Sequence, residues 1–528
     1  MRLHRRDFLK LVGVGAGAST IAGLSGCGVE QVSSDAAEHQ IRSDFVPDVE
    51  LQLTATDALA SILPGQQTRV WKYEGKVLKG DPAILQTIPD SYLGPIIRAK
   101  RGLKIRIHLN NKLREPTIIH WHGLHVPPEM DGHPRNAIGP GQSYVYDLEI
   151  RNRAGTYWFH PHPHQRTGFQ AYAGLAGLFL VSDDDVAAAS LPSGEFDVPL
   201  VIQDRAFNAS NELVYITNPM DQMTGVLGDR ILVNGRLDFE LNVATRAYRL
   251  RILNGSNSRI YKLAWDDGTP LVPIATDGGL LEKPVQRSYV TLGPGERVEL
   301  WADFGGRRVG SELRLKSLAF SGAEAGMMGG MTGGMMGGGM MGRGNTNVPQ
   351  GAEFTVLHVK VDREVKDHSP LPERFTAIQR YRVDDAINHQ NPRVFEVAMR
   401  GMGAWTINGR SFEMDGYASN ESVKLNTLEE WEFNNQTNAM GAMAHPMHIH
   451  GVHFQVLDRK IAPQFESVWE TVRAGYIDEG WKDTVLLWPG ERVRLLMRFE
   501  AFPGLFMYHC HNLEHEDQGL MRNYMIQA

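Results

Sequence analysis

The sequence contains very little cysteine, no large excess of charge and no apolar run long enough to cross a membrane. Its two cysteines among 528 residues are Cys27 and Cys510, so a mature chain without its leader has no internal disulfide. A net charge of −7 provides no broad basic surface, which argues against nucleic acid as a partner. The apolar run at residues 11–24 is about 14 residues long, whereas a membrane helix needs roughly 20.

The first 27 residues have the pattern of an export signal that is not part of the fold. Arg5 and Arg6 precede a glycine-rich apolar run, which is typical of the twin-arginine pathway. The run ends in LSGC, which resembles a bacterial lipobox and would place a lipid on Cys27, whereas plain cleavage nearby would leave no anchor. The polar residues 28–45 then suit a flexible tether. We therefore expect an exported protein, in the periplasm or at the outer face of the cell membrane, lipid-anchored or free.

Short alternating runs of β-branched and aromatic residues, separated by glycine and proline, predict an all-β chain built of sandwiches. One turn-then-strand pattern occurs three times, as GPGQSYVYDL at 139–148, GPGERVELWADF at 293–304 and WPGERVRLLMRF at 488–499. Such repetition predicts three similar units. We place the first unit at residues 46–187, the second at 188–368 and the third at 369–528.

The second unit ends in a segment of unusual composition, GMMGGMTGGMMGGGMMGRG at residues 326–344. A glycine matrix of this kind cannot build a hydrophobic core. Its seven methionines are Met327, Met328, Met331, Met335, Met336, Met340 and Met341. Thioethers are soft ligands that favour Cu(I) over hard cations, so the segment is a candidate for gathering cuprous ions. The alternative is a loop whose methionines make adaptable apolar contacts.

Histidines occur in four pairs with the spacing i, i+2. On a strand, residues two apart face the same side and lie roughly 6.5 to 7 Å apart, so each pair can present two imidazoles to one cluster of metal ions. A single pair is most often structural, but four pairs in one chain indicate several bound metal ions. The pairs are His120 and His122, His160 and His162, His448 and His450, and His509 and His511.

Cys510 lies between the last two histidines and should face away from both if that segment is extended. Its thiolate then belongs to a different site, within reach of His515 and His445 in the sequence. Two histidines and one thiolate form the ligand set of a blue-copper electron-transfer centre. Burial alone would also preserve a free thiol in an oxidising compartment.

The motifs HWHG, HPH, HPMHIHG and HCHNLEH together resemble the four copper signatures of the multicopper oxidases. The resemblance spans all three units and implies three consecutive cupredoxin-like Greek-key β-sandwich domains. It implies four copper ions, with the trinuclear cluster between the first and third units. The type 1 copper would be held by His445, Cys510 and His515, the type 2 copper by His120 and His448, and the two type 3 coppers by His122, His160, His162, His450, His509 and His511.

The resemblance also implies an enzyme that couples one-electron oxidation at the type 1 copper to the four-electron reduction of O2 to water at the cluster. Electrons would pass through Cys510 and its neighbouring histidines. Asp131 and Glu516 match acidic residues near the cluster in this family, and we expect them to relay protons. Leu520 occupies the position of the axial methionine, which implies a three-coordinate type 1 copper with a raised potential.

The methionine-rich segment makes the chain similar to the cuprous oxidases used in copper tolerance, and Met443 matches a methionine of their substrate-copper site. Gly441 departs from that pattern because it occupies the place of an acidic ligand. A laccase-like or bilirubin-oxidase-like enzyme that oxidises small phenols is the alternative. A non-catalytic copper-sequestering lipoprotein, in which the methionines are the function, is a third possibility of another class. We expect a monomer.

Overall fold

The computed structural model describes residues 44–325, 348–366, 370–400, 404–436 and 442–528. The leader, all of the tether except its last two residues, the methionine-rich segment and Gly441 lie outside these ranges. Within them, no helix combines the length and the apolar character that a membrane span requires.

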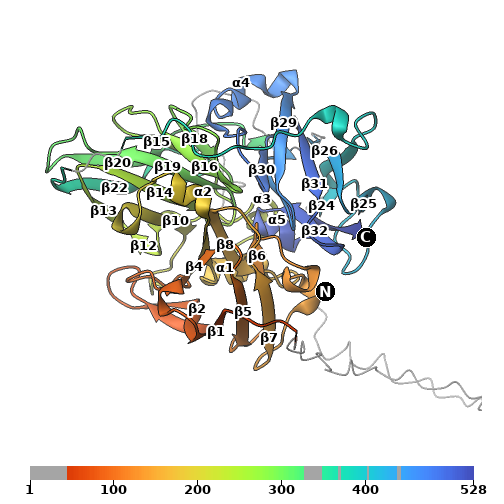
Figure 1. Cartoon of the computed structure of the whole chain (residues 1–528), viewed down its shortest axis with the longest axis horizontal. Coiled ribbons are helices and arrows are strands. Elements are labelled where there is room, and N and C mark those ends of the chain that lie inside the picture. The colour runs from red at the N-terminus through yellow and green to blue at the C-terminus, as the bar shows by residue number, and fades with distance from the viewer. Residues whose placement is uncertain (1–43, 326–347, 367–369, 401–403, 437–441) are drawn as a thin grey trace, which may run out of the picture. The chain divides into compact units, whose positions relative to one another are not determined.

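The first unit is a pair of sheets. Its strands are β1 (Val49–Ala60), β2 (Thr68–Lys79), β3 (Leu85–Gln86), β4 (Ile96–Lys100), β5 (Lys104–Asn111), β6 (Ile119–His122), β7 (Ser143–Glu149), β8 (Gly155–Pro161) and β9 (Gly177–Ser182). They form one sheet of order β2-β1-β5-β7 and one of order β3-β4-β9-β8-β6. Figure 1 shows strands of both sheets, among them β1, β5 and β7 of the first and β4, β6 and β8 of the second. Leu51 and Ile107 from the first sheet share a core with Trp121 and Phe179 from the second.

The second unit is also a pair of sheets, one of seven strands and one of five. Its strands are β10 (Asp197–Arg205), β11 (Arg230–Val233), β12 (Arg236–Leu237), β13 (Glu240–Ala244), β14 (Ala247–Asn254), β15 (Tyr261–Trp265), β16 (Pro273–Thr276), β17 (Gly279–Leu280), β18 (Val290–Leu292), β19 (Arg297–Asp303), β20 (Glu312–Ser317) and β22 (Phe354–Arg363). The sheet orders are β12-β11-β10-β14-β19-β16-β17 and β13-β22-β20-β15-β18. Ile252 and Leu300 meet Leu263 and Leu315 in the core between them.

The third unit pairs two five-stranded sheets. Its strands are β23 (Arg393–Arg400), β24 (Ala404–Ile407), β25 (Ser422–Lys424), β26 (Thr427–Asn435), β28 (His445–Ile449), β29 (Phe454–Ile461), β30 (Thr484–Leu487), β31 (Glu491–Phe499), β32 (Gly504–Cys510) and β33 (Met521–Gln527). The sheet orders are β24-β23-β26-β31-β29 and β25-β33-β32-β28-β30. A two-stranded sheet of β21 (Glu324–Ala325) and β27 (Ala442–Met443) joins the second unit to the third.

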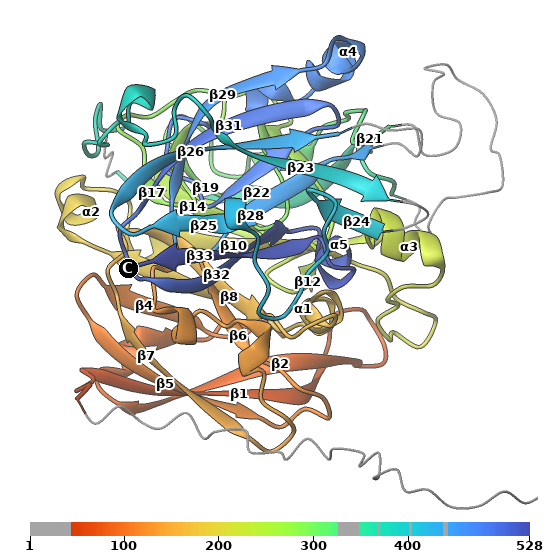
Figure 2. The ribbon, with the colours of Figure 1, turned by 90° about the vertical axis from the view of Figure 1, so that its right-hand side faces the viewer.

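Helices are few and short within the described residues. They are α1 (Thr167–Ala173), α2 (Asp184–Ala188), α3 (Pro219–Thr224), α4 (Glu466–Trp469) and α5 (Leu513–Asp517). Both α1, from the first unit, and α3, from the second, pack on α5 of the third (Figure 2). Segments from three parts of the chain therefore meet around α5.

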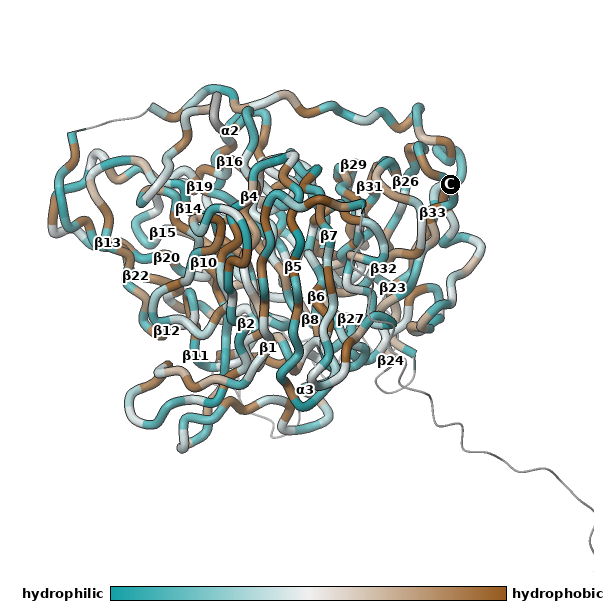
Figure 3. Tube along the Cα trace, turned by 60° about the horizontal axis from the view of Figure 1, so that its bottom comes forward, coloured by the Kyte–Doolittle hydropathy of each residue, from teal (hydrophilic) through white to brown (hydrophobic). Residues whose placement is uncertain are grey.

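The three repeated sequence stretches fold alike. They give β7, β19 and β31, each antiparallel to a long central strand, namely β5, β14 or β26. Apolar and polar residues are interleaved along these strands (Figure 3), because successive side chains point to opposite faces of a sheet. The predicted boundary at 187 falls within α2 and stays a prediction, while the boundary at 368 lies outside the described residues.

Removal of Trp431 should test the third core. This ring is fully buried in β26 and packs on Phe395 and Tyr508, with ring centroids 4.6 and 5.7 Å away. We expect Trp431→Ala to cost about 3–5 kcal/mol of stability, measured by denaturant unfolding of the metal-free protein. Leu59→Ala is the control, because that side chain is 63% exposed. Equal stability of the two variants would contradict this packing.

Candidate metal centres

Within the first unit and within the third, neighbouring strands bring two of the four histidine pairs side by side. In the first unit β6 pairs with β8, so that His120 lies opposite His160. In the third unit β28 pairs with β32, so that His448 lies opposite His509. The second histidine of each pair lies at the end of its strand or one residue beyond it. All eight side chains are buried.

His120 and His448 approach each other across the two units, with their Nε2 atoms 3.3 Å apart. A carbonyl oxygen can only accept, so the Nδ1 atoms of both rings must be protonated: His120 donates to the Asp131 carbonyl at 2.6 Å and His448 to the Asp483 carbonyl at 2.9 Å. Burial lowers the pKa of His448 well below its ordinary value. With both Nδ1 atoms bonded to carbonyl oxygens, the two Nε2 atoms face one another, an arrangement that a shared cation would stabilise.

A second convergence involves His122 and His160. The Nε2–H of His122 donates to the Asp483 carboxylate at 3.0 Å and the Nδ1–H of His160 to the Pro161 carbonyl at 2.9 Å. Their remaining nitrogens, Nδ1 and Nε2 respectively, are 3.4 Å apart. The ring of His511 lies 5.0 and 5.2 Å from these two rings, centroid to centroid, and neither of its nitrogens has a hydrogen-bond partner.

The third convergence joins His162, His450 and His509. Nε2 of His509 lies 3.0 Å from Nε2 of His450 and 3.4 Å from Nε2 of His162. Their Nδ1 partners differ: His450 donates to the Asp131 carboxylate at 2.7 Å and His509 to the Cys510 carbonyl at 3.1 Å. The chemistry of these nitrogen donors fits the copper ions that the motifs predict.

Cys510 faces away from both neighbouring histidines, as strand alternation predicts. Its Sγ lies 3.4 Å from Nδ1 of His445 and 3.8 Å from Nδ1 of His515, and the two nitrogens are 3.3 Å apart. His515, on α5, donates its Nε2–H to the Met223 carbonyl at 2.9 Å, so its Nδ1 is bare. Burial raises the pKa of the Cys510 thiol, which means that a buried thiolate needs a cation beside it. These three side chains fit a copper ion.

Leu520, the predicted axial residue, is a fully buried apolar side chain. Leu520 belongs to the same hydrophobic core as Cys510, and its carbonyl accepts the Cys510 N–H at 3.0 Å. Met521, on β33, lies opposite His509 of β32. Met443 is buried at the end of β27, opposite Glu324. The seven methionines of the segment 326–344 lie outside the described residues.

Asp131 and Glu516 both contact predicted ligands. Besides His450, Asp131 approaches His120, and burial raises the pKa of its carboxyl. Glu516 lies 3.1 Å from Nδ1 of His509. Burial alone would raise the pKa of Glu516, but nearby histidines lower it to about 2. Their role in proton transfer stays a prediction.

The motifs did not reveal the groups that hold α5. The Glu514 carboxylate accepts hydrogen bonds from Tyr215, Asn257 and Ser258 of the second unit, at 2.6 to 2.9 Å. The Asp517 carboxylate accepts two backbone N–H groups at the start of α1. In the sequence these acids are indistinguishable from solvated ones, since their partners lie more than 250 residues away.

Comparison with known sequences identifies the family that the motifs resemble. Residues 66–186 and 386–528 each match the family described as multicopper oxidase. A multicopper oxidase of Staphylococcus aureus is 31% identical over 429 residues, which cover 81% of this chain and 81% of that protein. A laccase of Bacillus subtilis is 29% identical over 527 residues, with 93% of each chain covered.

Comparison with solved structures also finds multicopper oxidases. The McoA multicopper oxidase of Aquifex aeolicus matches with a TM-score of 0.75 and 31% identity, over 92% of this chain and 97% of that one. A multicopper oxidase of Campylobacter jejuni, described as a metallo-oxidase, matches with a TM-score of 0.69 and 25% identity, over 92% and 94%.

The chain therefore belongs to the multicopper oxidase family, and the predicted all-β, cupredoxin-like fold is confirmed. It is an oxidoreductase whose family uses copper ions and reduces O2.

Replacement of Leu520 should lower the potential of the type 1 copper. A thioether in Leu520→Met would stabilise the oxidised ion, and a tenfold preference corresponds to about 59 mV for one electron. We expect a decrease of that order in a redox titration of the blue absorption. Met521→Leu is the matched control and should leave the potential unchanged. An unchanged or higher potential in Leu520→Met would show that position 520 is not axial.

Proposed function

We propose that this chain is a cuprous oxidase that binds four copper ions and serves copper tolerance. The type 1 copper is held by His445, Cys510 and His515, and the type 2 copper by His120 and His448. The observation that carries the proposal is the convergence of bare nitrogen and sulfur atoms in fully buried places, which costs energy without a cation. Two type 3 coppers are held by His122, His160 and His511 and by His162, His450 and His509.

Bound copper would supply stepwise storage of the four electrons that reduction of O2 to two waters requires. The chain's own contribution is connection and orientation. Cys510 is joined by single peptide links to His509 and His511, so the sulfur site and the histidine cluster share one strand end. Asp131 and Glu516 orient ligand rings and are the carboxylates placed to carry protons to this region.

A cavity lined by a residue next to a contact of His515 supports the choice of a cuprous donor. A cavity of about 580 Å³ is lined by Glu324 and Pro349, which lie on either side of the methionine-rich segment in the sequence. Thr224 lines the same cavity and follows Met223, whose carbonyl accepts the hydrogen bond of His515. Residues on both sides of the methionine-rich segment in the sequence therefore line a cavity that also includes the neighbour of Met223.

A laccase-like enzyme acting on phenols is the second candidate. Phe207 and Phe320 give the same cavity an aromatic lining, which suits a small organic donor, and the Bacillus subtilis relative is a laccase. A copper-sequestering protein without turnover is disfavoured, because all eleven predicted ligands are present and buried.

The leader supports export by the twin-arginine pathway, to the periplasm or the outer face of the cell membrane. Lipid on Cys27 would anchor the chain there. We propose a monomer as the working state.

Copper content tests the ligand assignment. Fully loaded protein should hold four copper ions per chain by elemental analysis and be intensely blue. Cys510→Ser should lose the blue absorption and one copper ion, because an uncharged hydroxyl replaces the thiolate, and should retain the other three. Fewer than four ions in the loaded natural chain would contradict the assignment.

Oxygen uptake with Cu(I) and with a phenol tests the donor. Deletion of residues 326–344 should reduce the cuprous activity at least tenfold and leave the phenol activity within about twofold, since the soft ligands favour Cu(I).

A variant of equal length with the seven methionines replaced by serine separates loss of sulfur from loss of the loop. It should behave like the deletion. Unchanged cuprous activity in both variants would exclude a role of the methionines in the reaction and favour the phenol oxidase.

A further inference from the structure

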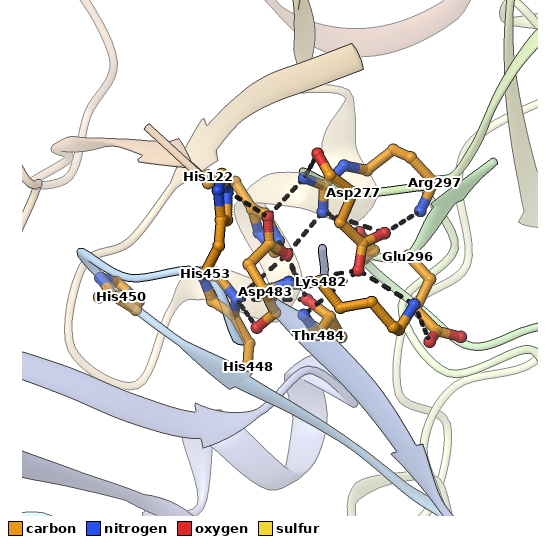
Figure 4. A network of polar contacts seen from close by, with 12 residues as sticks. His122, Asp277, Glu296, Arg297, His448, His450, His453, Lys482, Asp483 and Thr484 are labelled. Atoms are coloured by element: carbon orange, nitrogen blue, oxygen red, sulfur yellow. Dashed lines mark hydrogen bonds and ion pairs between the residues drawn. The ribbon is translucent and has the colours of Figure 1, made fainter. Parts of the chain in front are cut away.

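A fully buried ion pair joins the second and third units beside the histidine cluster. Arg297, at the start of β19, contacts both carboxylate oxygens of Asp483, which lies just before β30 (Figure 4). The Nη1–Oδ1 distance is 2.7 Å, and neither side chain is accessible to solvent. Burial alone would raise the pKa of Asp483, but the guanidinium outweighs it and keeps the pKa below its ordinary value.

The guanidinium is held from every side. Its Nε donates to the Thr156 carbonyl at 2.9 Å, Nη1 to the Gly295 carbonyl at 3.0 Å and Nη2 to the Asp277 carbonyl at 3.0 Å. Together with the two bonds to Asp483, all five N–H groups are used. A planar fork with no free donor has one orientation, so the position of the Asp483 carboxylate is fixed as well.

Asp483 transmits this orientation to two rings. Its Oδ1 accepts the Nε2–H of His122 at 3.0 Å, and its backbone carbonyl accepts the Nδ1–H of His448 at 2.9 Å. Thr484 donates its hydroxyl to the same Oδ1 at 2.9 Å. The two rings stack with centroids 3.7 Å apart. A hydrogen bond at one ring nitrogen fixes which nitrogen is left bare for a metal.

Further buried charges keep this arrangement in place. Lys482 lies 3.1 Å from the Asp277 carboxylate and 3.0 Å from that of Glu296, and Asp277 also accepts the backbone N–H of Arg297 at 2.8 Å. Charges without solvent are tolerated only when they are paired. The pairs fix the chain on both sides of the Arg297–Asp483 contact.

We propose that Arg297 is a positioning residue for the trinuclear copper site, contributed by the second unit, which supplies none of the predicted ligands. Through Asp483 it presents Nδ1 of His122 and Nε2 of His448 to the metal. The inference rests on the proposed function. It differs from a purely structural role because other buried arginines of the second unit, such as Arg249 paired with Glu299, do not contact the histidines.

The test compares Arg297→Lys with Arg249→Lys, which is the matched control. Both keep a buried positive charge, but only Arg297→Lys removes the two-point contact with Asp483. Electron paramagnetic resonance should show an altered type 2 hyperfine splitting in Arg297→Lys. Its type 2 copper should dissociate at least tenfold more readily, as expected when the group that orients a ligand is lost. The blue type 1 absorption should persist, and Arg249→Lys should keep the natural type 2 spectrum.

An unchanged type 2 spectrum and copper affinity in folded Arg297→Lys would overturn the inference, as would equal changes in Arg249→Lys. Thermal unfolding of the metal-free variants verifies that each is folded. Failure of the natural chain to bind four copper ions would instead contradict the proposed function, so the two failures are distinguishable.

Discussion

The structure depends on one electrostatic constraint: imidazole nitrogens that carry lone pairs are held a few ångströms apart in a fully buried place. All of these rings are buried, and for several of them a hydrogen-bond acceptor at one nitrogen leaves the other nitrogen bare. His120 and His448 show this most simply, since a carbonyl oxygen holds the far nitrogen of each ring. Repulsion between the facing lone pairs disfavours the metal-free arrangement, so metal binding and the packing of the units stabilise each other.

This constraint explains why so many buried polar groups occur where the units meet. Ligands from the first and third units converge only if the units keep a fixed relative position. Hydrophobic contacts alone would permit small shifts, whereas a bidentate pair such as Arg297 with Asp483 allows one geometry. The carboxylates of α5 act alike, because Glu514 contacts the second unit and Asp517 the first. The hydrophobic cores bury the histidines, and directional polar contacts between the units determine their positions.

Local patterns in the sequence predicted the strands and the paired histidines, because both are matters of spacing. Strand alternation alone placed Cys510 opposite in orientation to His509, and the three turn-then-strand repeats became β7, β19 and β31. The orienting groups were not predictable in this way. Asp483 and Arg297 are 186 residues apart, and in the sequence each resembles an ordinary charged residue near the end of a strand. The acidic residues of α5 likewise resemble solvent-exposed ones. Their roles arise from packing between units, which a single sequence does not encode locally.

The location of Cys510 follows from the same geometry. A strand that ends at the cluster must place alternate side chains on opposite faces, so the residue between two cluster histidines necessarily faces the interior of its own unit. There His445 contacts it from β28 and His515 from α5, and Leu520 belongs to the same apolar core. The two predicted metal centres thereby share one strand end. A shift of β32 by one residue would exchange the faces and disrupt both predicted centres at once, and pairing with β28 and β33 fixes the register of this strand on both sides.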